Sequence, residues 1–429
     1  MTDMCARLRS KKMTRSHKCG SFRVWVWCFP SLYFFQNGAI QNPQAAVLDG
    51  QGHITAVHLQ SRTVSELVVP APRIRVTLTD MMQRRYAKAV WLGMWFESVM
   101  HTGTANTAVR ESAQGIVAVE EFSKPFRLNI VDCRLASGEW LFRQTPSAVH
   151  AMDGLEFAYR PYGRTPLVAN GESIPWPLDT YPVLVHSAAR TADLYVFPIL
   201  STRVGNWRRF LSNELPMPLR EDANFEWLIY NTTTKRSYVV DTGATCCTLC
   251  RQGEFDARSV RVCHVKDLSA LLQSKRDEYT YPRFELRKDR IDLAKMALTE
   301  STHYPEASGD FPNPVNDSVV LINILENTTH QKVVFFDIDS EAVVKKVVLP
   351  HSARDVLHYE NHLLYCTLDL FCIYELEACR NVVELPIPRR CSNFHASLLT
   401  CSESQEFLFL RRRLEQRRGR RGQRRGRRE

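Results

Sequence analysis

Residues 333–376 read VVFFDIDSEAVVKKVVLPHSARDVLHYENHLLYCTLDLFCIYEL. Short runs of β-branched, aliphatic and aromatic residues alternate in this stretch with compact polar segments at 337–341, 351–354 and 359–362. Runs of this length and composition predict β-strands, and the polar segments between them predict tight turns. The stretch therefore predicts consecutive antiparallel strands joined by hairpins.

A strand, turn and strand pattern occurs twice, 96 residues apart. Asn231 opens NTTTKRSYVVD, which ends at Asp241, and Asn327 opens NTTHQKVVFFD, which ends at Asp337. An apolar run precedes each Asn, and an Asn side chain stabilises a turn by bonding to the backbone that follows it. We predict two hairpins that occupy equivalent positions of a repeated unit, with each Asp closing a strand.

Short strands of the same kind recur from about residue 44 onward, and regular antiparallel strands with tight turns indicate a sandwich, a barrel or a propeller. A propeller blade holds four strands in about 40–50 residues. Residues 333–376 fit one such blade and resemble β-propeller proteins of the divergent WD40 or YVTN kind. The resemblance implies an all-β, propeller-like array that serves as a binding platform.

Three helical insertions are expected within this array, at 80–101, 265–278 and 288–302, because good helix formers there follow capping residues or alternate with helical period. The chain then divides into three parts. Residues 1–38 are a basic segment, either a transit peptide or the first strands; residues 39–408 are the propeller-like domain; residues 409–429 are a disordered Arg/Gly-rich tail.

The two ends of the chain account for its net charge of +10, and the body between them is mildly acidic. A block of like charge stays extended, so the tail is expected to bind RNA or another polyanion, or to direct nuclear import. The tail residues predicted to do so are Arg411, Arg412, Arg413, Arg417, Arg418, Arg420, Arg421, Arg424, Arg425, Arg427 and Arg428.

The location of the protein is expected to be intracellular. The 13 Cys are an odd number and favour a reducing compartment. The apolar run 24–35 is shorter than the roughly 20 residues that a membrane helix needs, so no membrane span is expected. A nuclear location follows from the Arg tail, and a mitochondrial one is the alternative, because the N-terminal segment is basic and poor in acids.

One catalytic string stands out at the end of the first repeated hairpin. The sequence SYVVDTGAT resembles the active-site segment of retropepsin-like aspartic proteases. That resemblance implies that Asp241 is a catalytic carboxylate supported by Thr242 and Gly243. The alternative interpretation is a strand that simply ends in a turn, because the companion hairpin continues from Asp337 without the Thr-Gly pair.

A zinc site is a further alternative. Cys247, Cys250, Cys263 and His264 offer four ligands of the kind that Zn²⁺ takes. Cys263 and His264 are adjacent, however, and neighbouring residues of a strand point to opposite faces. The competing interpretation is buried strand cysteines beside an exposed histidine.

The 13 His do not cluster along the sequence, and no phosphate-binding loop or metalloprotease motif occurs. The sequence therefore predicts a non-enzymatic, propeller-like scaffold that binds protein partners, carries an RNA-binding or polyanion-binding tail and needs no cofactor. A retropepsin-like protease centred on Asp241 and a zinc-stabilised interaction protein are the alternatives.

Overall fold

The fold is that of a computed structural model of the 429-residue chain. It describes residues 32–40, 52–69, 105, 108–112, 115–119, 124–141, 157–159, 167–177, 188–190, 193–200, 211–212, 225–241, 260–265, 284–292, 294–307, 310–316, 318–325, 331–353, 355–367, 369–387 and 391–400.

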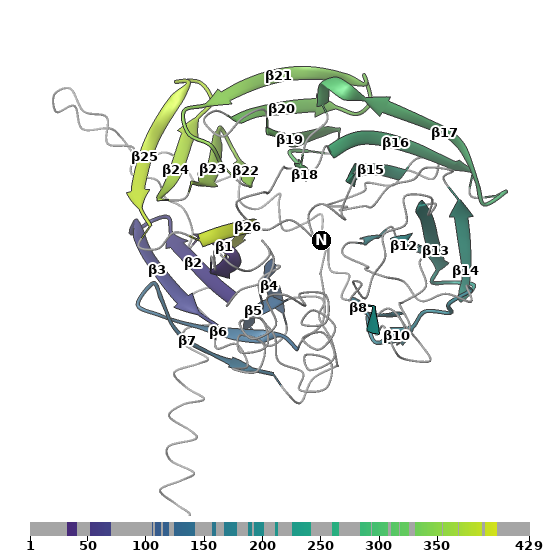
Figure 1. The fold of residues 1–429 in the computed structure, drawn as a ribbon, viewed down its shortest axis with the longest axis horizontal. Coiled ribbons are helices and arrows are strands. Elements are labelled where there is room, and N and C mark those ends of the chain that lie inside the picture. Colours follow the sequence, from purple (N-terminus) through teal and green to yellow (C-terminus); the bar gives the residue numbers. More distant parts are fainter. Residues whose placement is uncertain are drawn as a thin grey trace, which may run out of the picture.

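Within these residues the strands form seven antiparallel sheets, arranged as the blades of a ring (Figure 1). We number the blades in chain order. Blade 1 contains β26 (Cys391–Thr400), β1 (Leu32–Ile40), β2 (Gly52–His58) and β3 (Thr63–Val68). Blade 2 contains β4 (Ala108–Ser112), β5 (Gly115–Val119), β6 (Phe126–Val131) and β7 (Arg134–Trp140). Blade 3 contains β8 (Phe157–Tyr159), β9 (Leu167–Ala169) and β10 (Glu172–Ser173).

The second half of the ring repeats this order. Blade 4 contains β11 (Ala189–Arg190), β12 (Leu194–Leu200), β13 (Phe225–Asn231) and β14 (Arg236–Asp241). Blade 5 contains β15 (Val260–Val265), β16 (Phe284–Asp292) and β17 (Ala297–Tyr304), followed by the 3-10 helix η4 (Pro305–Ala307). Blade 6 contains β18 (Asp310–Pro314), β19 (Val319–Leu325), β20 (Gln331–Asp337) and β21 (Ala342–Leu349). Blade 7 contains β22 (Val356–Tyr359), β23 (His362–Cys366), β24 (Leu370–Glu375) and β25 (Arg380–Pro386).

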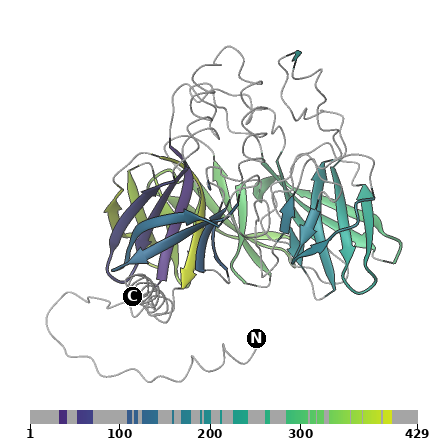
Figure 2. The ribbon, with the colours of Figure 1, turned by 90° about the horizontal axis from the view of Figure 1, so that it is seen from below.

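Blade 1 closes the ring with strands from both ends of the chain. β26 pairs antiparallel with β1 from Leu32↔Thr400 to Ile40↔Cys391, with one register shift at Asn37/Gly38. Each blade then runs outward, so that β26 lies near the axis and β3 lies at the rim (Figure 1). Seen from the side, the blades form one layer through which their strands run steeply (Figure 2).

The hydrophobic core is divided into clusters that lie between neighbouring blades. Alternate residues of a strand face opposite sides of its sheet, so both faces of a blade can pack against the adjacent blades. Phe34 of blade 1 contacts Phe371 of blade 7, with ring centroids 4.9 Å apart, and both side chains are fully buried. Burying a side chain of this size contributes about 1.5–3 kcal/mol. Packing between blades therefore holds the ring together.

The turn before the last strand of each blade is a structural repeat. Each of these seven turns contains a described residue with φ between 49° and 79°. Positive φ in a short hairpin matches the right-handed twist of its strands. The residues are Arg62, Cys133, Gly171, Lys235, Met296, Glu341 and Cys379.

In three consecutive blades an Asn or Asp side chain braces this turn. The Asn231 Oδ1 accepts from the backbone N–H groups of Thr233 and Thr234, at 3.0 and 2.8 Å. Asp292 and Asp337 each accept in the same way from the N–H groups two and three residues later. Blades 4, 5 and 6 thus share one turn chemistry, at positions 231, 292 and 337.

These observations decide the structural predictions. The predicted all-β, propeller-like fold is confirmed. The predicted equivalence of the two Asn-Thr-Thr hairpins is wrong. The first joins the third and fourth strands of blade 4, whereas Asn327 lies between β19 and β20, the second and third strands of blade 6. The true counterpart of Asn231 is Asp337, because both open the turn before the last strand.

The helix predicted at 288–302 is wrong, because β16 and β17 occupy that segment. Asp292 binds the N–H groups of Ala294 and Lys295 as a helix cap would, but Met296 has φ 49° and turns the chain back. A capping residue alone does not distinguish a helix start from a braced hairpin. The predicted helix at 80–101 lies outside the described residues, as does 265–278 apart from Val265, which ends β15. The predicted domain boundaries stay predictions.

Candidate functional site

The first strands of five neighbouring blades lie side by side around the axis of the ring. β15 lies beside β18, β18 beside β22, β22 beside β26, and β26 beside β4. Three of these strands carry a histidine: His264 in β15, His358 in β22 and His395 in β26. Histidines that are up to 131 residues apart in sequence are thus placed on strands that surround one axis.

His358 is the axial-strand histidine whose side chain is described. It is half-buried, and its ring meets the edge of Phe335 from blade 6 at a centroid distance of 5.7 Å. Burial lowers the pKa of His358, and the nearby His362 and Lys345 lower it further. Burial is also the main cause that lowers the pKa of His362. Both imidazoles are therefore favoured in the neutral form, the form that can bind a metal.

A buried polar network joins three axial strands. Asp355, directly before β22, is fully buried, and its Oδ2 accepts from the backbone N–H of Ala396 in β26 at 2.7 Å. The amide of Asn313 in β18 donates to the backbone carbonyl of Val356 at 2.9 Å and lies 3.4 Å from the Asp355 Oδ1. A buried charge is retained only when it is hydrogen-bonded. Asp355 therefore fixes β26, and with it the backbone of His395, against blades 6 and 7.

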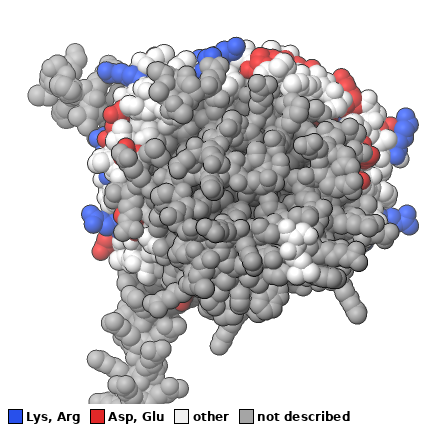
Figure 3. Space-filling model, viewed as in Figure 1, with Lys and Arg blue, Asp and Glu red and all other residues white. Residues whose placement is uncertain are grey.

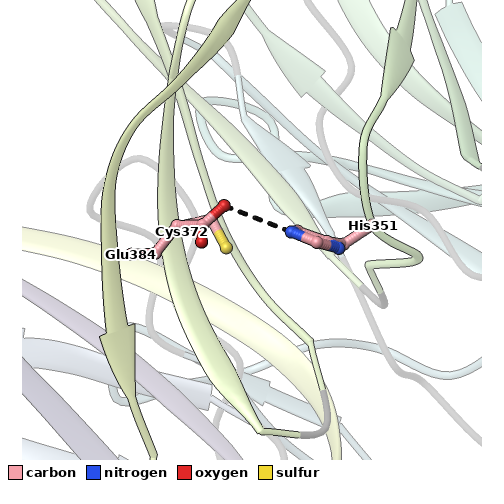
Figure 4. Close-up of side chains that lie close together, drawn as sticks. All are labelled: His351, Cys372 and Glu384. Carbon is pink, nitrogen blue, oxygen red and sulfur yellow. Dashed lines mark hydrogen bonds and ion pairs between the residues drawn. The ribbon is translucent and has the colours of Figure 1, made fainter.

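A separate group of metal-type ligands lies away from the axis. The side chains of His351, Cys372 and Glu384 converge, and one ligand atom from each lies within 4.8 Å of the others (Figure 4). Cys372 and Glu384 are register partners on β24 and β25, and His351 follows β21. The His351 Nε2 and the Glu384 Oε1 are 3.2 Å apart. Among the residues that the structure describes, this is the one group of three or more such ligands.

The charges in this off-axis group are set by its neighbours. Asn381 and His351 hydrogen-bond Glu384 and lower the pKa of its carboxyl. Burial raises the pKa of the Cys372 thiol to about 12, because the charged thiolate is poorly solvated there. At neutral pH the group therefore holds an ionised carboxylate and a protonated thiol.

The residues predicted to form a protease site are only partly described. Asp241 ends β14, the outermost strand of blade 4, where it is exposed and pairs in register with Glu226. Thr242 and Gly243 lie outside the described residues. Asp337, by contrast, opens a braced turn between β20 and β21, and the residues that follow Asp241 lie outside the described part of the chain.

The predicted zinc site is only partly described and stays a prediction. Cys263 and His264 are consecutive residues of β15, facing Leu286 and Glu285 in the ladder, while Cys247 and Cys250 lie outside the described residues. The eleven predicted polyanion-binding arginines also lie outside, and their role stays a prediction, as do the protein partners and the nuclear or mitochondrial location.

On the face shown in Figure 3, the visible charged side chains of the described residues lie along the rim of the ring, with both signs interspersed. On β16 and β17, for example, the exposed Arg290 and Glu300 pair at 2.5 Å. No helix among the described residues is long and apolar enough to cross a membrane.

The sequence alone did not predict that the histidines on the axial strands form a group. It pointed to one of them, His264, and only as a zinc ligand. The available signal was a His within the first strand of several blades. It could be read only after the blades had been delimited.

No protein-family model matches the chain, and no curated protein matches it. Solved structures do share its fold. Pseudomonas brassicacearum lignostilbene dioxygenase is 14% identical, with a TM-score of 0.61 over 87% of this chain and 92% of that one. A variant of Synechocystis apocarotenoid oxygenase is 11% identical, with a TM-score of 0.60 over 87% of this chain and 93% of that one. The same oxygenase was solved in cobalt-substituted form, with a TM-score of 0.58.

These likenesses correct four predictions. The fold resembles oxygenase propellers and not WD40 or YVTN repeat proteins. The prediction of a non-enzymatic, RNA-binding scaffold is wrong on this finding, because the proteins that share the fold are oxygenases, and neither the protease nor the zinc-stabilised alternative gains support. The predictions of no cofactor or of zinc conflict with a neighbour that was solved with a substituted metal.

Along most of its length, the chain is thus similar in fold to carotenoid oxygenases and to lignostilbene dioxygenase.

Proposed function

We propose that this protein is a metal-dependent oxygenase that oxidises a conjugated, largely apolar alkene at the axis of the propeller. The observation that carries the proposal is a match in fold over 87% of the chain to enzymes named as apocarotenoid and lignostilbene oxygenases. A shared fold hosts many functions, so the proposal also needs a site. The histidines on the axial strands supply the candidate.

His264 and His395 are the candidate ligands by chemistry and by the placement of their strands, whereas the ring of His358, although on an axial strand, packs against Phe335 of blade 6. Imidazole nitrogens suit iron and cobalt, and neutral imidazole is the binding form. The three residues belong to first strands of different blades, and these strands surround one axis. Iron would supply the activation of O₂ when bound. We infer that His264 and His395 hold it, and that Asp355 keeps the strand of His395 in position.

The test is oxygenation of a defined substrate by the iron-loaded protein. Purified protein is incubated with an apocarotenal or a hydroxystilbene under ¹⁸O₂, and the products are analysed by mass spectrometry. The expected result is a cleaved or oxidised alkene that contains ¹⁸O. Failure of the iron-loaded protein to oxidise either substrate class would overturn the proposed function.

Two variants and a matched control test the site. His264→Ala and His395→Ala are expected to lower bound iron and turnover by at least about tenfold, because each removes an axial imidazole. His303→Ala is the control, because His303 is exposed on β17, the last strand of blade 5. Full iron content and turnover in both axial variants would contradict the ligand assignment, even if the protein proves to be an oxygenase.

A further inference from the structure

We propose that His351, Cys372 and Glu384 form a second metal site, away from the axis, for one late first-row divalent cation. The site would join the connection between blades 6 and 7 to the two outer strands of blade 7. It does not depend on the proposed oxygenase function, because none of its residues belongs to an axial strand.

The geometry is close to that of a coordination site. In tetrahedral coordination with bonds of about 2.0–2.3 Å, ligand atoms lie roughly 3.3–3.8 Å from one another. The three ligand atoms here lie within 4.8 Å of one another, and the His351 Nε2 to Glu384 Oε1 distance is already 3.2 Å. A contraction of about 1 Å or less would therefore admit a cation.

Two of the three ligands are held by the sheet itself. Cys372 and Glu384 face each other in the ladder of β24 and β25, so their separation is fixed by strand pairing. His351 approaches from a different segment, directly after β21. Figure 4 shows its ring directed toward the carboxylate and the sulfur. Convergence of three donors from three segments distinguishes this group from a chance acidic pair.

A supporting set of hydrogen bonds orients the carboxylate. The Asn381 Nδ2 donates to the Glu384 Oε1 at 2.7 Å, and the Tyr365 hydroxyl donates to the Asn381 Oδ1 at 2.9 Å. Residues behind the ligands commonly fix ligand orientation in metal sites. The chain from Tyr365 through Asn381 performs this task for Glu384, since Tyr365 is itself fully buried.

The donor set selects the class of cation. A sulfur, an imidazole nitrogen and a carboxylate oxygen disfavour Mg²⁺ and Ca²⁺, which prefer oxygen ligands alone. Cys372 is buried, whereas His351 and Glu384 reach solvent, so a fourth position on their side is open to water. Binding replaces the thiol proton: the S–H bond breaks, a sulfur–metal bond forms, and the proton passes to solvent.

Titration of the metal-free protein with Co²⁺ tests the site, because a thiolate bound to cobalt gives a sulfur-to-metal charge-transfer band. The axial histidines carry no sulfur and cannot give this band. The expected result is a band that saturates at about one equivalent of Co²⁺ and a raised melting temperature. Absence of the band in the parent protein would overturn the proposal.

Substitutions identify the residue that gives rise to the charge-transfer band. Cys372→Ser is expected to abolish it, and Cys379→Ser, at an exposed cysteine in the β24–β25 turn, is expected to retain it. His351→Ala and Glu384→Ala alter solvent-accessible side chains, so the fold should survive, and each should weaken Co²⁺ binding at least about tenfold. An unchanged band in Cys372→Ser, or unchanged affinity in both surface variants, would refute the site.

Discussion

Replacement of Asp355 by Ala should loosen the strand that closes the ring. The Asp355 Oδ2 accepts from the Ala396 N–H at 2.7 Å, in a position with no exposure to solvent. Ala396 lies in β26, and β26 joins the last part of the chain to β1. The change therefore removes a fixed point between blades 1 and 7.

The magnitude follows from the bonds lost. A hydrogen bond to a charged group contributes about 1.5–3 kcal/mol, and the longer contact with Asn313, at 3.4 Å, contributes less. Together the loss should be about 2–4 kcal/mol. Asp355→Asn keeps an oxygen acceptor but loses the charge, so it should cost about half as much.

Hydrogen exchange measured by mass spectrometry gives a local readout. If β26 opens locally, a loss of 2–4 kcal/mol corresponds to exchange that is about 30- to 700-fold faster in β26 peptides. Peptides from β21 serve as the internal reference. Glu377→Ala, in the exposed β24–β25 turn, is the control and should change stability by less than about 0.5 kcal/mol. An unchanged exchange rate of β26 peptides in Asp355→Ala would refute this role of Asp355.

Three further substitutions test other parts of the ring. Gly138→Ala should destabilise the protein by about 1–3 kcal/mol, because a Cβ there would lie 2.8 Å from the Arg127 carbonyl and overlap the Phe126 ring; an unchanged melting temperature would contradict this. Asp289→Ala should cost about 2–4 kcal/mol in thermal unfolding, because Asp289 accepts from the Trp227 indole at 3.0 Å and from Ser301 at 2.6 Å; a loss below about 0.5 kcal/mol, typical of a surface substitution, would argue against it. Hydrogen bonds from Lys235 and, to a smaller extent, from Tyr230 lower the pKa of Glu172. The stabilisation of the fold by ionised Glu172 is therefore present at neutral pH and is lost as the pH falls through the lowered pKa. The difference in melting temperature between the parent protein and Glu172→Gln should therefore shrink toward about pH 3, and a constant difference would speak against the pairing.

Local chemistry made the strands predictable but not their division into blades, because 333–376, expected to be one blade, holds the last two strands of blade 6 and the first three of blade 7. The alternating strands and polar turns of 333–376 correspond to β20 through β24, and the Asn231 turn forms as expected. The same chemistry misled at Asp292, where the capping interaction opens a hairpin instead of a helix. It also misled about the second hairpin, because the segment that contains Asn327 connects the second and third strands of blade 6 and not the third and fourth. Turn residues indicate that the chain reverses direction, but they do not indicate which two strands of a blade the turn connects.

The candidate site could not be found in this way, because it depends on closure. His264 and His395 are 131 residues apart, and only the convergence of β15, β18, β22 and β26 places their strands around one axis. That convergence requires β26 to pair with β1, a contact between opposite ends of the chain. Periodicity within a short window carries no information about such a contact.

Anomalous diffraction at the iron edge, from crystals of the iron-loaded protein, locates the metal directly. A peak on the propeller axis, within coordination distance of histidines on β15 or β26, is the result expected of an axial oxygenase centre. An axis without iron in protein that retains the ring of blades would contradict it.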